Sequence, residues 1–354
     1  MKHLLITGAG GSGASNVIAS LRLSKEKYML IGCDISKYHL ELTEGLDRKY
    51  LIPRTSDSSY FSVLHKIIKK EKIDFIHPQT EQEVLLFAKN PDKVRATFLL
   101  PSLAAIELCQ NKIQLNLLLK DKKIPAPDCA VFSDEESFRS SLALLLKKNA
   151  KVWLRATKGA GSKAALPIDN PLHGLMWIDY WSKHKGLSIT NFMIAEYLPG
   201  REYAFQSLWY KGKLITSMAR ERLEYLYGFL SPSGQSSTPQ LAKTVHNNRV
   251  NDIATRAILA ADKNPYGVYC VDLKENSKQV PCVTEINVGR FFTTSNFFSV
   301  AGINMPELYI KLGLGKSLPR LKQYNPLPKG WYWVRMVDMG YKLVKGEKWT
   351  SQKI

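Results

Sequence analysis

The segment from Gly267 to Arg290, GVYCVDLKENSKQVPCVTEINVGR, constrains the fold more than any other part of the chain. Two runs rich in β-forming residues flank a polar turn, which predicts a β-hairpin. Side chains alternate across a strand, so Glu285 and Asn287 face the same side of the sheet. If the turn centres near residues 278–279, Asp272 lies opposite Glu285. Three such oxygen ligands predict a Mg²⁺ site that is shared with substrate phosphates.

A simpler interpretation is that these acidic residues are only solvated. Apolar neighbours argue against it, because they place the hairpin in the core, where an isolated carboxylate needs a partner. These neighbours are Val268, Tyr269, Val271, Val280, Val283 and Ile286. We therefore expect a cation or a basic side chain beside the carboxylates.

Length and composition predict an ordinary soluble globular protein. The 354 residues are 45% hydrophobic and 23% charged, which leaves room for two or three domains. No apolar run approaches the roughly 20 residues that span a bilayer, and the start MKHLLITGAGG reaches glycine too early for a secretory signal. We expect a cytoplasmic protein without a membrane span. The five cysteines are scattered and form no CxxC pair, which argues against disulfides and zinc.

The net charge of +19 raises nucleic acid or an anionic membrane as partners. Lysine is spread along the chain, however, and no motif of a nucleic-acid reader is present. A positive surface also attracts phosphorylated or carboxylate substrates. We therefore expect no nucleic-acid partner.

The order of predicted elements indicates a mixed α/β chain. The first hundred residues alternate strands (HLLIT, YMLIGCD, DFIHP) with helices, which is typical of a parallel sheet. A single helix is expected from Ile106 to Lys123, and a capping box from Ser133 to Glu136 opens another. Further strands, a helix at about residues 251–263 and the hairpin follow. The chain ends in the basic, aromatic run WYWVRMVDMGYKLVKGEKW.

A first glycine loop, GAGGSG, follows the first strand. Gly8, Gly10 and Gly13 have the G-x-G-x-x-G spacing, and Asp34 ends the next strand. This is the context of a dinucleotide-binding fingerprint. The alternative is that these glycines only permit a tight turn and close packing of a helix.

A second glycine loop lies in WLRATKGAGSKAAL, residues 153–166. A strand delivers Arg155, and Lys158 and Lys163 flank a run of small residues whose backbone donors suit a polyphosphate. The loop lacks the GK[ST] ending of a Walker A motif. A hairpin turn with solvated lysines is an equally good interpretation of the loop alone.

Taken in order, these motifs resemble the ATP-grasp superfamily, especially its carbamoyl-phosphate-synthase-like and carboxylate-amine ligase branch. The resemblance covers about residues 1 to 315. It implies an α/β and α+β fold in which a Rossmann-like preATP-grasp domain, lacking a dinucleotide, precedes a two-lobed ATP-grasp fold. The implied divisions are residues 1–105 for the preATP-grasp domain, 106–190 for the N-terminal lobe with its glycine-rich lid, 191–318 for the C-terminal lobe with the metal site, and 319–354 for the basic aromatic segment.

The resemblance implies ATP and Mg²⁺ (or Mn²⁺) as cofactors and assigns a role to each matching residue. The nucleotide-binding residues are Lys112 and Arg155 for the phosphates, Lys158, Gly161 and Ser162 in the lid, Glu196 and Leu198 for adenine, and Glu202 for ribose. The implied metal ligands are Asp272, Glu285 and Asn287. Arg290 would steady the phosphoryl group that is transferred.

The chain departs from the family pattern in two places. The usual Asn-Pro-Arg run is here Asn287-Val288-Gly289-Arg290, one residue longer. Residue 155 is arginine where many relatives have lysine, which favours the carbamoyl-phosphate-synthase-like branch. The chain has a single copy of the module and no glutaminase or carboxyltransferase segment, which argues against a complete carbamoyl phosphate synthase or a biotin-dependent carboxylase.

The implied function is an ATP-dependent ligase that joins a small-molecule carboxylate to an amine through an acyl phosphate. Arg222 is a candidate clamp for the substrate carboxylate, although a solvated strand edge explains it equally well. Thr80, Glu81 and Glu83 could bind the amine, although a role at the start of a helix explains acids there equally well. An enzyme that activates bicarbonate, a NAD-binding oxidoreductase and a noncatalytic basic scaffold are the alternatives, and a homodimer is an expected assembly.

Overall fold

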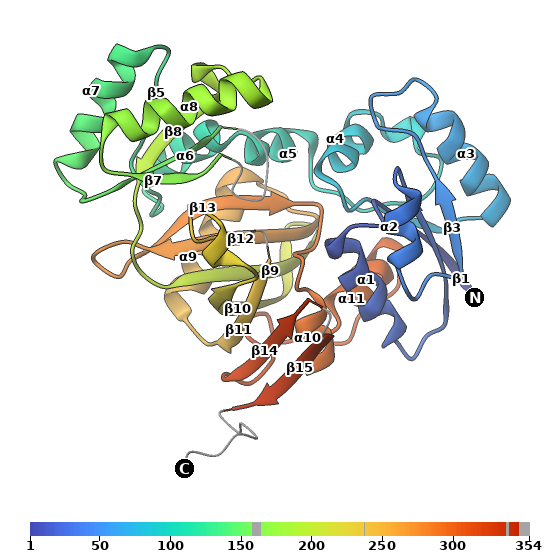
Figure 1. Cartoon of the computed structure of the whole chain (residues 1–354). Coiled ribbons are helices and arrows are strands. Elements are labelled where there is room, and N and C mark those ends of the chain that lie inside the picture. Colours follow the sequence, from blue (N-terminus) through green and yellow to red (C-terminus); the bar gives the residue numbers. More distant parts are fainter. Residues whose placement is uncertain (158–163, 237, 338–339, 347–354) are drawn as a thin grey trace.

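The computed structural model describes residues 1–157, 164–236, 238–337 and 340–346. Within these residues there are three sheets (Figure 1): a four-stranded parallel sheet, a seven-stranded antiparallel sheet and a four-stranded antiparallel sheet. This is the mixed α/β and α+β fold that the sequence predicts. Among the described helices, none combines the length and the hydropathy needed to cross a membrane.

The parallel sheet has the strand order β3-β2-β1-β4. Its strands are β1 (Lys2–Thr7), β2 (Tyr28–Asp34), β3 (Arg48–Leu51) and β4 (Phe75–His77), and its helices are α1 (Ser12–Arg22), α2 (Lys37–Leu42), α3 (Tyr60–Glu71) and α4 (Glu81–Lys89). The central strands are apolar along most of their length because a parallel sheet is covered on both faces. The alternation of strands and helices is thus confirmed.

The GAGGSG loop packs against side chains at the end of β2, on α2 and after β4. The N–H of Gly10 donates to Oδ2 of Asp34 at 3.0 Å, and a Cβ on Gly10 would lie 2.5 Å from His39. A Cβ on Gly13 would lie 2.5 Å from Gln79. These contacts favour the interpretation that the glycines permit a tight turn and close packing, since Asp34 is already bonded to the loop.

The small antiparallel sheet has the order β5-β8-β6-β7 and carries two helices. Its elements are β5 (Cys129–Val131), α7 (Glu135–Leu146), β6 (Val152–Ala156), β7 (Leu166–Ile168), α8 (Pro171–Lys185) and β8 (Phe192–Glu196). The capping box lies one residue later than predicted: Asp134 is the N-cap and accepts from the N–H of Ser137.

The prediction of one helix from Ile106 to Lys123 is wrong. Two helices occupy the region, α5 (Leu103–Gln110) and α6 (Lys112–Asp121). Asn111 leaves the helical conformation, and its side chain accepts a hydrogen bond from the N–H of Gln114. Asparagine competes with the helix in this way because its side chain can satisfy a free N–H at a new helix start. The break places Lys112 on the first turn of α6.

The seven-stranded sheet has the order β13-β12-β9-β10-β11-β14-β15. Its strands are β9 (Glu202–Tyr210), β10 (Lys213–Tyr225), β11 (Pro239–Val245), β12 (Gly267–Glu275), β13 (Pro281–Val288), β14 (Trp331–Met336) and β15 (Gly340–Lys345). The helices that accompany it are α9 (Asn248–Ala261), α10 (Asn296–Ala301) and α11 (Met305–Gly313). The basic aromatic run near the end of the chain therefore extends this sheet beside β11.

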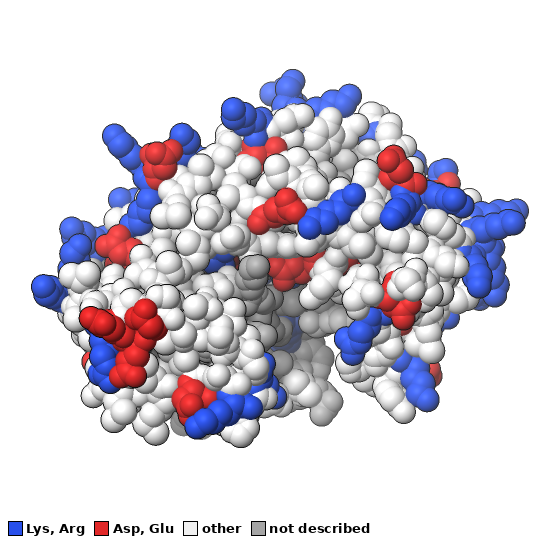
Figure 2. All heavy atoms as spheres, turned by 90° about the horizontal axis from the view of Figure 1, so that it is seen from above, with Lys and Arg blue, Asp and Glu red and all other residues white. Residues whose placement is uncertain are grey.

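Charged residues are distributed over the surface. Figure 2 shows Lys and Arg around the margin of the upper face, with Asp and Glu between them and a hollow near its centre. The basic side chains on this face are interspersed with acidic ones rather than gathered in a single patch.

His77, at the end of β4, joins the parallel sheet to the seven-stranded sheet. Its ring centre lies 5.6 Å from that of Phe291 and 5.2 Å from that of Tyr309, and its Nε2 lies 2.7 Å from Oε1 of Gln79. Gln79 also donates to the carbonyl of Phe291 at 2.9 Å. Burial lowers the pKa of His77 to about 4.

The low pKa of His77 predicts a loss of stability in acid. The unfolded chain binds a proton at this histidine below about pH 6.5, whereas the folded chain stays neutral until about pH 4. The contribution of His77 to the free energy of unfolding is therefore fully present above about pH 6.5, and about 3 kcal/mol is lost as the pH falls to about 4. Gln in place of His77 cannot titrate. Urea unfolding across this range should show a flatter pH dependence for His77→Gln, and equal slopes would contradict the prediction.

Candidate functional site

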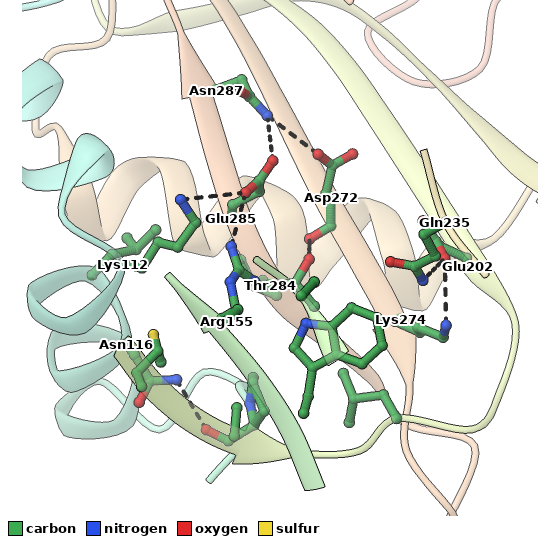
Figure 3. Close-up of a pocket in the computed structure, with 18 of the residues that line it drawn as sticks. Lys112, Asn116, Arg155, Glu202, Gln235, Asp272, Lys274, Thr284, Glu285 and Asn287 are labelled. Carbon is green, nitrogen blue, oxygen red and sulfur yellow. Dashed lines mark hydrogen bonds and ion pairs between the residues drawn. The ribbon is translucent and has the colours of Figure 1, made fainter. Parts of the chain in front are cut away.

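A pocket lies between the small antiparallel sheet and the seven-stranded sheet. Side chains from α6, β6 and β8 line one wall, and side chains from β9, β10, β12 and β13 line the other. Figure 3 shows the charged members of both walls pointing toward one another. The pocket brings together, within the described residues, almost every site residue that the sequence predicts.

The hairpin of β12 and β13 has the register that the sequence predicts, with Asp272 opposite Glu285. A β-bulge at Thr284 interrupts the pairing, and the Thr284 hydroxyl donates to the carbonyl of Asp272 at 3.1 Å. Nδ2 of Asn287 lies between the two carboxylates, 3.2 Å from Oδ2 of Asp272 and 3.3 Å from Oε1 of Glu285 (Figure 3). The three predicted metal ligands are thus adjacent on one sheet face.

Two cations from the opposite wall reach Glu285. Nη2 of Arg155 lies 3.2 Å from Oε2 of Glu285, and Nζ of Lys112 lies 3.9 Å from the same oxygen (Figure 3). Burial alone would raise the pKa of Glu285, but Lys112 and Arg155 outweigh burial and lower that pKa to about 2. Burial and the charge of Arg155 lower the pKa of Lys112. Glu285 is therefore an ionised carboxylate held against two cations.

The pKa of Asp272 is shifted in the opposite direction to that of Glu285. Burial raises the pKa of Asp272 to about 7, against the opposing charge of Arg222, and the neighbouring charge of Glu285 adds to the rise. Nη2 of Arg222 lies 2.6 Å from Oδ1 of Asp272, and Nη1 lies 3.0 Å from Oε1 of Glu202. The predicted substrate clamp therefore has both ends of its guanidinium bound to carboxylates of the protein.

Glu202 anchors a second polar group at the far side of the pocket. Its Oε2 lies 3.5 Å from Nζ of Lys274 and accepts from Nε2 of Gln235 at 3.0 Å, and Tyr225 donates to its other oxygen (Figure 3). The sequence prediction missed Lys274 and Tyr225. A signal was available for Lys274, because it follows Asp272 by two residues on the same strand and so shares its face.

Glu196 and Leu198 line the end of the pocket that the sequence assigns to adenine. The N–H of Glu196 already donates to the carbonyl of Asp128 at 2.7 Å. Trp153 and Tyr197 lie nearby, with ring centres 6.2 Å apart, and give this end an aromatic wall. Such a surface suits a flat heterocycle.

Arg290 and Glu81 lie at the other end. Arg290 donates to Oδ1 of Asn287 and lines both the main pocket and a small adjoining cavity, which Glu81 also lines. Glu81 begins α4, where Thr80 is the N-cap and accepts from the N–H of Glu83 at 3.2 Å. Lys158, Gly161 and Ser162, the predicted lid residues, lie outside the described residues.

The donor set fits Mg²⁺ better than a transition metal. Two carboxylates and one amide offer a few hard oxygens, which is what Mg²⁺ takes from a protein when phosphates and water fill its other positions. In the described part of the chain, no three His, Cys, Asp or Glu side chains are grouped for a metal. Asn287 currently directs Oδ1 toward Arg290, so its amide would have to rotate to become an oxygen ligand.

No protein-family model matches the sequence, and no curated protein matches it either. Solved structures do match the fold. An L-amino acid ligase from Bacillus licheniformis superposes with a TM-score of 0.67 at 15% identity, over 94% of this chain and 79% of that one. A biotin carboxylase from Campylobacter jejuni, solved with a β,γ-ATP complex, gives a TM-score of 0.69 at 16% identity, over 94% and 74%.

An N5-carboxyaminoimidazole synthetase from Staphylococcus aureus, solved with ADP, also superposes. Its TM-score is 0.69 at 14% identity, over 95% of this chain and 82% of that one. At these identities the likeness shows the fold, and these structures share the ATP-grasp fold.

Proposed function

We propose that this chain, which has the ATP-grasp fold, is an ATP-dependent ligase that joins a carboxylate to an amine. One observation carries the proposal: the carboxylate pair of Asp272 and Glu285 faces Lys112 and Arg155 across the pocket. A polyphosphate with Mg²⁺ complements this arrangement, since the metal would bind the carboxylates and the phosphates would bind the cations. Structures of similar fold that were solved with ADP or as an ATP complex support a nucleotide as the ligand.

In this proposal the carboxylate of the substrate attacks the γ-phosphorus of ATP, which releases ADP and forms an acyl phosphate. An amine then attacks the acyl carbon, and phosphate and a proton leave as the amide forms. Attack is slow without help because both reactants are anionic. Bound Mg²⁺ would supply charge neutralisation at the phosphates. Lys112 and Arg155 would hold the phosphates, and Arg290 would steady the transferred group. The protein would thus align the reactants and provide positive charges that are already in place when the reaction begins.

We assign Arg222 a positioning role in place of the predicted substrate clamp. It bonds to Glu202 and Asp272, so a substrate carboxylate would have to displace one of them. Arg222 would therefore hold the predicted ribose ligand and one predicted metal ligand in fixed places. Glu81, in the small cavity beside Arg290, is the acidic group best placed to receive a cationic amine.

An enzyme that activates bicarbonate is the second candidate. Arg155, where many relatives have lysine, favours it, because a planar guanidinium can hold a phosphate bidentately. The division into residues 1–105, 106–190, 191–318 and 319–354, a homodimeric assembly and a cytoplasmic location remain predictions.

Nucleotide binding distinguishes the proposed ligase from the NAD-binding alternative. MgATP at about 100 times its Kd should raise the Tm by roughly 4 °C, whereas NAD⁺ and NADH should leave it unchanged. NAD(H) should not bind because the GAGGSG loop is packed against Asp34 and Gln79. MgATP should bind because the pocket between the two antiparallel sheets offers cations and carboxylates together. Differential scanning fluorimetry measures the shift.

ADP release distinguishes a ligase from a binding scaffold. With a panel of acids, amines and bicarbonate, release should require both an acid and MgATP. Stabilisation by NAD(H) without stabilisation by MgATP would overturn the proposal. MgATP binding with no ADP release across the panel would favour the scaffold.

A further inference from the structure

Arg220 is a buried cation that the proposed reaction does not use. It lies on β10 two residues before Arg222, so both point from the same face of the sheet. Its exposed fraction is 0%, and Nε, Nη1 and Nη2 have no hydrogen-bond partner among the described residues. Arg222, in contrast, is bound to Glu202 and Asp272. A guanidinium has five N–H donors, so the difference between the two arginines is large.

The surroundings of Arg220 are aromatic. Its guanidinium carbon lies 4.8 Å from the ring centre of Phe292 and 5.3 Å from that of Phe298. These rings attract a cation but accept no hydrogen bonds in the plane of the guanidinium. Burial and the charge of Arg222 lower the pKa of Arg220 to about 9. Cys270 and Asp272 act in the opposite direction, so the site holds a positive charge that feels a carboxylate but makes no hydrogen bond among the described residues.

Phe292 separates Arg220 from the pocket. Phe292 lines the pocket, and its ring also lies 5.3 Å from the guanidinium carbon of Arg222. On the sheet, Ala204 is the residue opposite both Arg220 and Asp272, so only a methyl group stands between them on this face. Rotation of one aromatic side chain would join Arg220 to the pocket, close to Asp272.

Further buried donors without partners among the described residues occur in the segment after Phe292 and on β14. Arg335 donates to the carbonyls of Pro239 and Thr293 at 3.0 and 3.2 Å, while its Nη2 is buried and unpaired within the described residues. The hydroxyls of Thr294 and Ser295 are buried and likewise unpaired there. The charge of Arg335 acts on Arg220, so a second cation lies near the first, and both suit an anion.

We propose that the pocket continues past Phe292 to Arg220, and that Arg220 binds a second carboxylate of the acid substrate while Phe292 turns aside. This inference rests on the proposed ligase function and names the substrate class as a dicarboxylic acid. The phosphates of ATP are a poorer occupant, because Lys112 and Arg155 already offer them cations beside Glu285. The remote carboxylate would anchor the acid so that its other carboxylate lies at the γ-phosphate.

Paired acids test the inference. Succinate, glutarate and adipate carry two carboxylates, and butanoate, pentanoate and hexanoate are their monocarboxylate matches. With MgATP present, at least one dicarboxylate should bind the wild-type chain about 30-fold more tightly than its match, by calorimetry and by ADP release. Arg220→Met should abolish this preference, Arg220→Lys should keep part of it, and Arg256→Met, at an exposed arginine of α9, should keep all of it.

Stability gives an independent readout. Arg220→Met removes an unpaired buried charge, so the variant should melt at or above the wild-type temperature and still bind MgATP. Equal binding of the two acid series by the wild type would overturn the inference, as would a dicarboxylate preference that survives in Arg220→Met. If Arg220→Met does not fold, the wild-type preference and its change in Arg220→Lys decide the matter. Failure of MgATP to bind the wild type would instead refute the proposed function itself.

Discussion

Replacing Glu285 with alanine is expected to lower ATP turnover about 10³-fold or more while the fold stays intact. Glu285 faces Lys112 and Arg155. The side-chain amide of Asn287 donates to both Glu285 and Asp272. The carboxylate would therefore hold the metal against the phosphates and also space the two cations. Its removal leaves the phosphates without a fixed position, and charge neutralisation in the transition state is lost.

Three measurements separate this loss of catalysis from a loss of structure. ADP release gives the turnover, circular dichroism gives the fold, and the Mg²⁺ dependence gives the metal requirement. Glu224→Ala, at the exposed end of β10, is the matched control and should retain wild-type turnover. If Glu285→Ala retains turnover within tenfold of the wild type, Glu285 is not a metal ligand and the prediction is wrong.

Replacing Arg222 with methionine is expected to lower the free energy of unfolding by about 3–5 kcal/mol at about pH 8. The guanidinium bonds to Asp272 at 2.6 Å and to Glu202 at 3.0 Å, and its side chain is 9% exposed. Without it, two buried carboxylates face each other with no cation between them. Arg222 lowers the pKa of Asp272, so its removal raises that pKa above the value of about 7 that Asp272 has beside Arg222. The repulsion is therefore greatest in alkali, where Asp272 of the variant is ionised.

The cost should shrink as the pH falls, because the raised pKa of Asp272 lets the folded variant take up a proton before the unfolded chain does. Urea unfolding at several pH values measures this dependence. Asp272→Asn added to Arg222→Met should recover part of the loss, whereas Arg139→Met, which breaks an exposed ion pair with Glu135, should cost less than about 1 kcal/mol. If Arg222→Met lowers the free energy of unfolding by less than about 1 kcal/mol, the ion pairs of Arg222 with Asp272 and Glu202 do not stabilise the fold as predicted.

Local patterns predict the hairpin well. Its register follows from strand alternation and the position of the turn, and Asp272 does lie opposite Glu285. The bulge at Thr284 escapes such reasoning, because an extra residue in one strand leaves the apolar pattern almost unchanged. The break between α5 and α6 escapes it for a similar reason: apolar spacing continues through Asn111.

Contacts between side chains that are far apart in the chain could not be predicted from the sequence. Arg222 is expected to meet a substrate, yet it meets Asp272, which lies 50 residues away in the chain. Only the order of strands in the sheet brings β10 and β12 to either side of β9. The contacts of Arg220 could not be predicted either, because the two rings that stack on it come from the segment after β13 and from α10.

A crystal structure of the chain with Mg²⁺ and a nonhydrolysable ATP analogue tests the central claim most directly. The account predicts density for the nucleotide between the two antiparallel sheets, with its phosphates at Lys112 and Arg155 and a metal ion at Asp272 and Glu285. Nucleotide density at the GAGGSG loop instead, or phosphates remote from that carboxylate pair, would contradict it.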